Sequence, residues 1–407
     1  MSTDSREVCY DYHFRNRRKG KTLVWMSKIP SYSAQTAKLL ERSHTPKQVN
    51  SGLDHTLEYF ELDPGEELHY RYRIDIHPVD QETARPARLS QAEKNDYLKS
   101  TTYVTITPEI EELARSLCKD LDGTREKAYT LFRYVVRRFR YSARVKKRGT
   151  ILFIKSRKGD CGEFAALYAA LCRSVGIPCR MVVGSFAVDK NQYHVWNEVF
   201  LEEGWIPVDT SMANVQLKQP WRFLFSNIRT FKPHRYFGQT EGQRIAFSLG
   251  SNIPCVPTYP DFHKIDKEQT NEFSMQLGEE TIVWGKGILK NGEIPYLQPM
   301  YLYYEEELKK PKVTDYLGDW KVTEKGRRNT YLMVKKGAGY ATLLSALLHF
   351  LFSYTIFSIL YTVFGLVYAV MSVLRRERTV FFSLISLILL GIHLFVLVAY
   401  LSLKFLS

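Results

Sequence analysis

The chain has 407 residues, of which 45% are hydrophobic and 25% charged, and it carries a formal net charge of +14. This composition is that of a globular protein, and the length allows two or three domains with sizeable cores. The positive charge favours anionic partners, such as acidic lipid headgroups, nucleic acid or acidic substrates. The six cysteines contain no Cys-x-x-Cys pair, which excludes a zinc ribbon and a thioredoxin motif, and they are too few for a disulfide scaffold. We expect neither a metal nor a cofactor.

The first 105 residues have the pattern of β-strands. Apolar and polar residues alternate strictly over residues 68–77, which predicts a strand with one buried face. Residues 9–14 and 23–26 are its expected strand partners, and Asp-Pro-Gly at 63–65 is a turn signal. We therefore predict a small β-sandwich-like module over residues 1–105.

Helical periodicity begins at Pro108, a residue that suits the first turn of a helix. Gly123 fits the end of this helix, and a second helix is expected over residues 124–140. Between positions 133 and 158 there are eleven Lys or Arg residues and no acid, mostly in a predicted loop over 141–158. This basic stretch is either a solvated loop or a docking patch for anionic lipid or substrate.

Cys161 is the first candidate for chemistry. The residues that follow it, up to position 173, are strong helix formers, while Gly159 and Asp160 supply a turn and an N-cap. Cys161 therefore lies at or beside a helix N-terminus. The partial positive charge there stabilises a thiolate, and backbone N–H groups can face an oxyanion.

His194 and Asp209 are the other two candidates. A strand over residues 193–200 and a strand over residues 205–209 are joined by a short turn, so we expect an antiparallel pair that brings Asp209 beside His194. A nucleophilic thiol needs a base and a group that orients the base, and imidazole and carboxylate fill these roles. We expect this pairing to lower the pKa of Cys161 to about 3.5–7.5. The backbone N–H of Cys161 is a candidate oxyanion donor, and no side-chain donor is evident.

Four sequence blocks, in this order, carry a resemblance to a known family. They are GDCGEFAAL from Gly159, RSVGIPCR from Arg173, HVWNEV from His194 and GWIPVDT from Gly204. Together they resemble the core of the transglutaminase-like superfamily over roughly residues 100–215, and residues 237–252 are similar to the flanks of prokaryotic members. The resemblance implies an α+β fold with a papain-like transglutaminase core, which we place at residues 106–254. It also implies that Cys161 is the nucleophile, His194 the base and Asp209 the orienting carboxylate.

The end of the chain has the composition of membrane segments. Residues 341–374 and 379–403 contain no charged side chain. Each stretch is long enough to span about 30 Å of hydrocarbon, so we predict a transmembrane helical hairpin within a membrane domain at 341–407. A buried hairpin in a globular core is the alternative. Residues 255–340 are expected to be a mixed extension of unknown role.

The orientation is predicted from the distribution of Lys and Arg. Six of them precede the first span and three lie in the link over residues 375–378, so the catalytic domain is expected in the cytoplasm. The lack of a visible secretory signal agrees with this expectation.

Thiol-based acyl chemistry on protein or peptide amides is the function that the sequence predicts. Either water or an amine resolves the thioester, giving hydrolysis or transamidation, and the residues do not choose between them. No acidic Ca²⁺ loop is visible. A catalytically inactive membrane scaffold or binding protein that keeps the fold is the alternative. Nucleic-acid binding through the basic stretch is not expected, because no recognised motif accompanies it.

Overall fold

The structure is a computed structural model. It describes residues 6–79, 88–145, 147–188, 191–223, 226–260, 274–277, 280–289, 291–306, 308–375, 377, 388, 391, 392 and 395. The chain divides into two compact units, of which the first contains residues 1–219 and 231–323 and the second residues 220–230 and 324–407. The domain boundaries predicted at residues 105 and 254 fall inside the first unit and remain predictions.

The strands of the described residues are β1 (Arg6–Arg15), β2 (Thr22–Ser27), β3 (Gln35–Arg42), β4 (Gln48–Ser51), β5 (Thr56–Leu62), β6 (Glu67–Ile76), β7 (Arg140–Tyr141), β8 (Lys147–Arg148), β9 (Lys158–Gly159), β10 (Cys179–Phe186), β11 (Tyr193–Leu201), β12 (Gly204–Val208), β13 (Arg244–Leu249), β14 (Ile253–Pro254), β15 (Ser274–Leu277), β16 (Glu280–Val283), β17 (Glu293–Ile294), β18 (Met300–Tyr303) and β19 (Asp319–Glu324). The helices of the first unit are α1 (Gln91–Leu98), α2 (Pro108–Leu117), α3 (Thr124–Arg138), α4 (Thr150–Ser156), α5 (Cys161–Ser174), α6 (Thr210–Lys218), the 3-10 helix η2 (Pro233–Tyr236) and α7 (Thr314–Leu317). Those of the second unit are the 3-10 helix η1 (Pro220–Phe223), α8 (Arg327–Phe352) and α9 (Thr355–Leu374).

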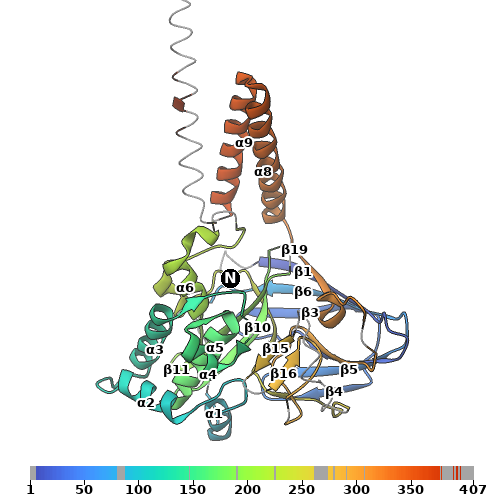
Figure 1. Ribbon diagram of the computed structural model, residues 1–407, viewed down its shortest axis with the longest axis vertical. Helices are drawn as coiled ribbons and strands as arrows, with labels where there is room; N and C mark the ends of the chain where they lie inside the picture. Colours follow the sequence, from blue (N-terminus) through green and yellow to red (C-terminus); the bar gives the residue numbers. More distant parts are fainter. Residues whose placement is uncertain are drawn as a thin grey trace, which may run out of the picture. The chain divides into compact units, whose positions relative to one another are not determined.

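The N-terminal strands form two four-stranded sheets, with strand orders β19-β1-β6-β3 and β18-β2-β5-β4. Strands β1, β6 and β3 run side by side (Figure 1). Every second side chain of β6 is buried, as the alternation predicts. Apolar residues of both sheets share one core, which makes this part a β-sandwich. One expected pairing is wrong: β1 pairs with β6, but β2 lies in the other sheet and pairs with β5.

Strands from far along the chain complete both sheets. β18 pairs with β2, and β19 stands at the edge beside β1. Residues 255–340, expected to be an extension of unknown role, therefore supply one strand to each sheet. The sequence gives no sign of this because strand pairing across roughly 280 residues leaves no local pattern.

The part of the first unit that contains Cys161 consists of helices against the sheet β12-β11-β10-β13. Helix α5 lies against β11 and β10 (Figure 1), and nearly all of its side chains are buried. The predicted helices are confirmed: α2 begins at Pro108, and α3 occupies 124–138. The stretch expected as a loop over 141–158 contains instead the short helix α4 and strands β8 and β9.

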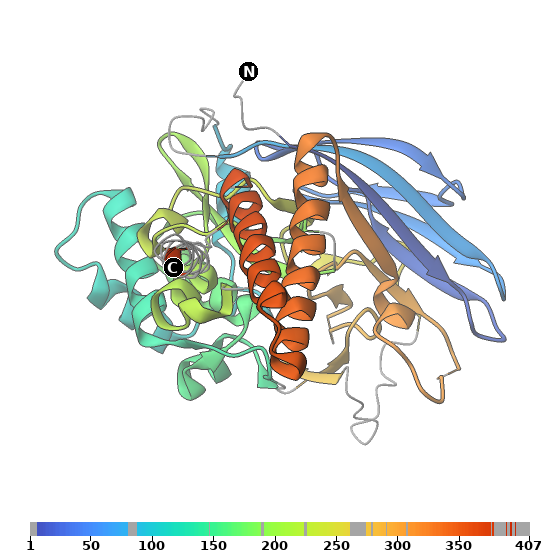
Figure 2. The same cartoon turned by 90° about the horizontal axis from the view of Figure 1, so that it is seen from above.

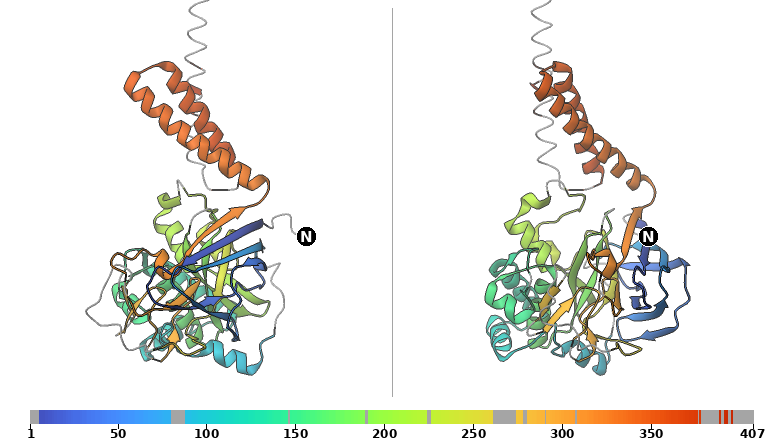
Figure 3. Two further views of the ribbon diagram at one scale, coloured as in Figure 1. Left: turned by 90° about the vertical axis from the view of Figure 1, so that its right-hand side faces the viewer. Right: turned by 45° about the vertical axis from the view of Figure 1, so that its right-hand side comes forward.

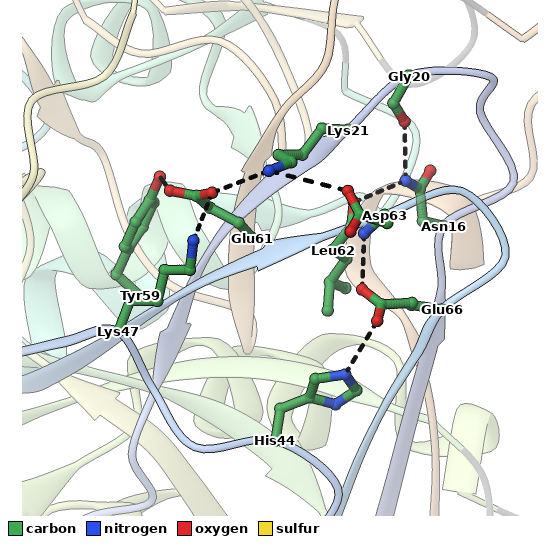
Figure 4. Close-up of polar contacts among 10 residues, drawn as sticks. All are labelled: Asn16, Gly20, Lys21, His44, Lys47, Tyr59, Glu61, Leu62, Asp63 and Glu66. Carbon is green, nitrogen blue, oxygen red and sulfur yellow. Dashed lines mark hydrogen bonds and ion pairs between the residues drawn. The ribbon is translucent and has the colours of Figure 1, made fainter.

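Polar contacts hold the ends of the sandwich hairpins (Figure 4). The Asn16 amide donates to the carbonyls of Gly20 at 2.9 Å and Leu62 at 3.0 Å, which fixes the β1–β2 turn against β5. Lys47 donates to the Glu61 carboxylate at 2.7 Å. The Asn16 side chain is buried, so its contacts outweigh those of the exposed Lys47 pair, which contributes little to stability.

The second unit contains an antiparallel helical hairpin, made by α8 and α9 (Figures 2 and 3). The single span predicted over residues 341–374 is therefore wrong. As one helix it would be about 51 Å long, well beyond the hydrocarbon thickness. The chain reverses at Ser353, a residue with φ 54° whose N–H bonds to the His349 carbonyl at 2.7 Å. Within the described residues, α9 is the one helix long and apolar enough to cross a membrane. The second predicted span, 379–403, lies outside the described residues except at four positions.

Buried ion pairs occupy the position at which a charged hairpin link was expected. Arg375 bonds to Glu324 and Glu377, both at 2.7 Å, and Lys335 also pairs with Glu377. All four side chains are buried. The predicted orientation counts Arg375 and Lys335 among the positive charges that flank the spans. Because both are buried in ion pairs, this count is weaker support, and the orientation remains a prediction.

Candidate active site

Cys161 is the first residue of α5, and Asp160 is its N-cap. The Asp160 carboxylate accepts from the Gly162 N–H at 2.9 Å, while Glu163 accepts from the Asp160 N–H at 3.2 Å. This is a complete capping box, which the Asp-x-x-Glu spacing encodes. The thiol consequently lies at the N-terminus of the helix, as predicted.

A buried arginine contacts both carboxylates of this cap. Arg148, in β8, lies 2.5 Å from Asp160 and 3.0 Å from Glu163. Burial, followed by the charge of Asp160, raises the pKa of Glu163 to about 8, although Arg148 acts in the opposite direction. The Tyr103 hydroxyl lies 2.5 Å from where a Cβ at Gly162 would be, so only glycine fits at this position. The helix start is therefore a closely packed polar cluster.

His194 lies in β11 and is 5% exposed. Its Nε2 is 2.6 Å from Oδ2 of Asp209, so Nδ1 is the ring nitrogen that remains for proton exchange. The ring lies between Phe186, at 4.6 Å between centroids, and Trp196, at 5.9 Å. These two aromatic rings restrict the imidazole to one orientation.

Asp209 accepts on both carboxylate oxygens. Oδ1 accepts from the Ser211 hydroxyl and from the Met212 N–H, both at 2.8 Å, which makes Asp209 the N-cap of α6. Oδ2 contacts His194 at 2.6 Å and Arg244 at 2.7 Å. Burial alone would raise the pKa of Asp209, but His194 and Arg244 outweigh it and hold the pKa well below its usual range. This group is ionised at neutral pH.

Side-chain bonds to the backbone of α5 hold the three elements together. Asn197, in β11, donates to the Ala165 carbonyl at 3.0 Å, and the Thr210 hydroxyl donates to the Phe164 carbonyl at 3.3 Å. The helix that carries Cys161 is thereby tied to the strand of His194 and to the residue after Asp209. In addition, a backbone hydrogen bond from Val195 reaches the Cys161 thiol and lowers its pKa. The thiol is therefore next to the β11 backbone at His194.

The expectation of a lowered pKa for Cys161 is wrong for this structure. Burial, followed by the charge of Asp160, raises the thiol pKa well above its usual range, and Val195 and Arg148 do not offset this. Across the described part of the chain, no hydrogen bond joins the Cys161 sulfur to the His194 ring. The resting site thus holds a neutral thiol rather than a preformed thiolate–imidazolium pair.

The sequence analysis missed two arginines. Arg148 is one of eleven basic residues in a run, and nothing local distinguishes it from its solvated neighbours. Arg244 lies in the stretch over 237–252 that resembles the flanks of related proteins, but no role could be read for it. Among the described residues, no group of three His, Cys, Asp or Glu side chains could hold a metal ion.

Comparison with known proteins agrees with the motif blocks. Residues 111–210 match the model of the family described as transglutaminase-like superfamily. The kyphoscoliosis peptidases of Mus musculus and Homo sapiens are 26% and 27% identical to this chain over 144 and 141 residues. These matches cover 32% and 31% of this chain, and the chain spans only about a fifth of each relative, 22% and 21%.

Two solved structures are similar over larger parts of the chain. A candidate cysteine protease from Cytophaga hutchinsonii is 13% identical and has a TM-score of 0.44, covering 79% of this chain and 98% of that protein. The periplasmic domain of TgpA from Pseudomonas aeruginosa is 16% identical with a TM-score of 0.34, covering 54% and 93%. Since both scores lie below 0.5, the chemistry below depends on the geometry of the site itself.

Proposed function

Because residues 111–210 of this chain are a transglutaminase-like core, we propose that the protein is a membrane-anchored cysteine enzyme acting on protein or peptide amides. Cys161 is the nucleophile, His194 the general base and Asp209 the residue that orients the base. The observation that carries the proposal is the 2.6 Å contact between His194 Nε2 and Asp209 Oδ2, which directs Nδ1 away from the carboxylate.

The proposed reaction has two half-reactions. The Cys161 sulfur attacks the amide carbonyl while its proton passes to His194 Nδ1, and the same proton then goes to the departing amine or ammonia. A thioester remains on Cys161. Water or a lysine amine attacks this thioester, with His194 taking its proton and returning it to the sulfur. We favour hydrolysis over transamidation because both curated relatives are named as peptidases.

The neutral resting thiol assigns a specific task to His194. If Cys161 were already a thiolate, it could attack as soon as substrate binds. Because it is a neutral thiol, its proton must move to His194 as the sulfur attacks. The Cys161 N–H at the α5 N-terminus is the proposed donor to the oxygen that becomes negative, because the N–H groups of Gly162 and Phe164 already bond to Asp160. General base catalysis by His194 is therefore the proposed route.

A basic surface next to the site is proposed to bind anionic lipid. Arg140 in β7 pairs in register with Lys158 in β9, so two strands bring distant cations together two residues before the Asp160 cap. Eight Lys and Arg side chains of this surface are exposed and have no ion pair within the described residues: Arg133, Arg137, Arg138, Arg140, Arg144, Lys155, Arg157 and Lys158. Unpaired exposed cations attract acidic headgroups by about 1 kcal/mol each near a membrane.

Vesicle binding tests the lipid proposal. Arg140→Glu and Lys158→Glu together should weaken binding of the full chain to vesicles that contain phosphatidylserine, and leave binding to neutral vesicles unchanged. Lys38→Glu combined with Lys321→Glu, on strands of the sandwich, is the matched charge control. Equal loss with the control pair would remove this surface as the lipid site. A loss of cleavage of acidic peptides without loss of vesicle binding would assign it to substrate instead.

The membrane anchor is proposed to include α9, whose 20 residues measure about 30 Å and have a mean hydropathy of 2.1. Many apolar side chains of the α8–α9 hairpin are exposed, for example Leu343 at 70% and Phe350 at 82%. Apolar surface of this extent is suited to lipid. Cytoplasmic placement of the catalytic core remains part of the proposal.

An inactive scaffold that keeps the fold is the second candidate function. The raised thiol pKa and the lack of a Cys161–His194 hydrogen bond within the described residues favour it. The close contact between His194 and Asp209 is the arrangement that a general base requires, which is why we rank the enzyme first.

Labelling by an electrophilic thiol probe, followed by mass spectrometry of the Cys161 peptide, separates the two. We expect Cys161 to be labelled in the wild type and labelled at least tenfold more slowly in His194→Ala, because the base is lost. Cys161→Ala should retain the fold and lose all acyl transfer. The labelling of Cys9, which is partly exposed and lies on β1, is the internal control. Labelling of Cys161 that does not depend on His194 would favour the scaffold.

A further inference from the structure

Arg244 makes a contact that the three proposed catalytic residues do not account for. It lies in β13 and is 4% exposed, and its Nη1 is 2.7 Å from Oδ2 of Asp209. That is the oxygen which also contacts His194 at 2.6 Å. The other carboxylate oxygen is already occupied by the α6 cap, at Ser211 and Met212. One oxygen is therefore shared between the proposed base and a permanent cation.

The position of the Arg244 guanidinium is fixed from several sides. Glu241, which is 1% exposed, bonds to Nε of Arg244 at 3.0 Å and lies 2.9 Å from its Nη2. The guanidinium also lies 5.2 Å from the ring centroid of Phe186 and 5.1 Å from that of Trp196. These are the two rings that enclose His194. The same pair of aromatic side chains thus sets the positions of both groups that contact Asp209.

We propose that Arg244, held by Glu241, is a positioning residue that moderates the pull of Asp209 on His194 and so keeps the imidazole able to accept the thiol proton. This inference rests on the proposed function of Cys161 and His194. No bond to substrate is implied, since Arg244 acts only through Asp209.

The electrostatic reason follows from the shared oxygen. An ionised carboxylate favours positive charge on a neighbouring imidazole, and an imidazole that is already protonated cannot act as a base. A cation on the other side of the same oxygen opposes that protonation. The effect passes through the shared carboxylate oxygen, so it requires both Arg244 and Asp209. The lowered pKa of Asp209 agrees with this arrangement, because His194 and Arg244 together hold it ionised.

Other charged and titratable groups around the pair also contribute. Tyr236 of η2, Glu241 before β13 and Tyr32 before β3 interact with Arg244, and Cys161 of α5 interacts with Asp209. None of them contacts Asp209 Oδ2 among the described residues, so the variant that isolates the effect is at Arg244.

The test is the pH dependence of Cys161 alkylation by iodoacetamide in the full chain, followed by mass spectrometry of the Cys161 peptide. In Arg244→Gln the acid limb of the rate profile should move to higher pH. Arg244→Lys, which retains the charge, should restore the limb toward the wild-type position. In an Asp209→Asn background, Arg244→Gln should produce no further shift, because the group through which it acts is gone.

Two further measurements separate this role from a structural one. Arg244→Gln leaves Glu241 buried without its partner, so the double variant Glu241→Gln/Arg244→Gln is measured in parallel to remove that charge. The double variant should fold and still show the shifted acid limb. An unshifted limb in the folded double variant, or a shift that persists without Asp209, would overturn the inference. If wild-type alkylation does not depend on His194, the proposed function fails instead, which is a different result.

Discussion

Replacement of Asp209 by asparagine tests the orientation of the base most directly. The side chain keeps its size, and the asparagine carbonyl can still accept from Ser211 and Met212 at the start of α6. The amide NH₂ must then face His194 and Arg244, whose nitrogens lie 2.6 and 2.7 Å from this oxygen in the wild type. A donor facing His194 Nε2 stabilises the tautomer with the proton on Nδ1.

That tautomer removes the base. Nδ1 is the nitrogen left for Cys161, and once it carries a proton it cannot accept another. In the Ser-His-Asp enzymes the equivalent change lowers kcat by about 10⁴-fold, which corresponds to about 5.5 kcal/mol in the barrier. We expect a loss of the same order here, about 10³–10⁴-fold, in turnover and in probe labelling of Cys161.

Ser211→Ala is the matched control for this variant. It removes a neutral hydrogen bond to the other oxygen of the same carboxylate and leaves His194 and Arg244 in place. We expect it to reduce the rate by less than about tenfold. Labelling rates are compared at pH 7 for folded protein in detergent, with circular dichroism as the check on folding. If Asp209→Asn reacts as fast as Ser211→Ala, the orientation argument is refuted.

Two predictions concern stability. Burial and Asp160 raise the pKa of Glu163 to about 8. The folded state therefore binds a proton at Glu163 more tightly than the unfolded chain does. The free energy of unfolding should fall as the pH rises from about 4.5 to about 8. In Glu163→Gln the midpoint of thermal unfolding should lose this dependence, and an unchanged slope would contradict the shift. Arg180→Met should lower the free energy of unfolding by about 3–5 kcal/mol, because it leaves the buried Glu198, 2.7 Å away, and Asp54, 2.6 Å away, as charges without their cation. The triple variant Arg180→Met/Glu198→Gln/Asp54→Asn should recover much of that loss in a denaturant titration, and equal instability of both variants would mean that the ion pairs are not the cause.

The local parts of the site follow from the sequence because their signals are local. A capping box at Asp160 fixes where α5 begins, and a short turn fixes the antiparallel register of β11 and β12. These two features are enough to predict that Asp209 lies beside His194, without knowledge of the remaining fold. Arg180 and Glu198 belong to the same motif blocks, but the structure makes them a cross-strand ion pair. A motif therefore contains residues that support the fold as well as residues proposed for chemistry.

The parts that sequence reasoning missed depend on contacts between distant segments. β18 reaches β2 across about 280 residues, and Arg244 reaches Asp209 across 35 residues and an intervening helix. The pattern of charge-free residues over 341–374 also did not reveal the reversal at Ser353, since a serine in the left-handed region has no marked sequence signal. Apolar composition indicates what a segment is buried in and does not indicate where the chain turns.

The charge balance around Cys161 explains why the thiol is neutral at rest and how it could still react. Asp160 near the sulfur opposes a second negative charge, and Arg148 compensates for only part of this effect. Transfer of the thiol proton to His194 places a positive charge beside Asp209, which is ionised and ready to stabilise it. The negative charge meanwhile passes from sulfur to the carbonyl oxygen of the amide, at the N-terminus of α5, and does not stay on the buried sulfur. The site therefore stabilises a transition state in which the positive charge is on His194 and the negative charge is on the carbonyl oxygen of the amide. The same groups do not stabilise a thiolate–imidazolium pair before substrate binds.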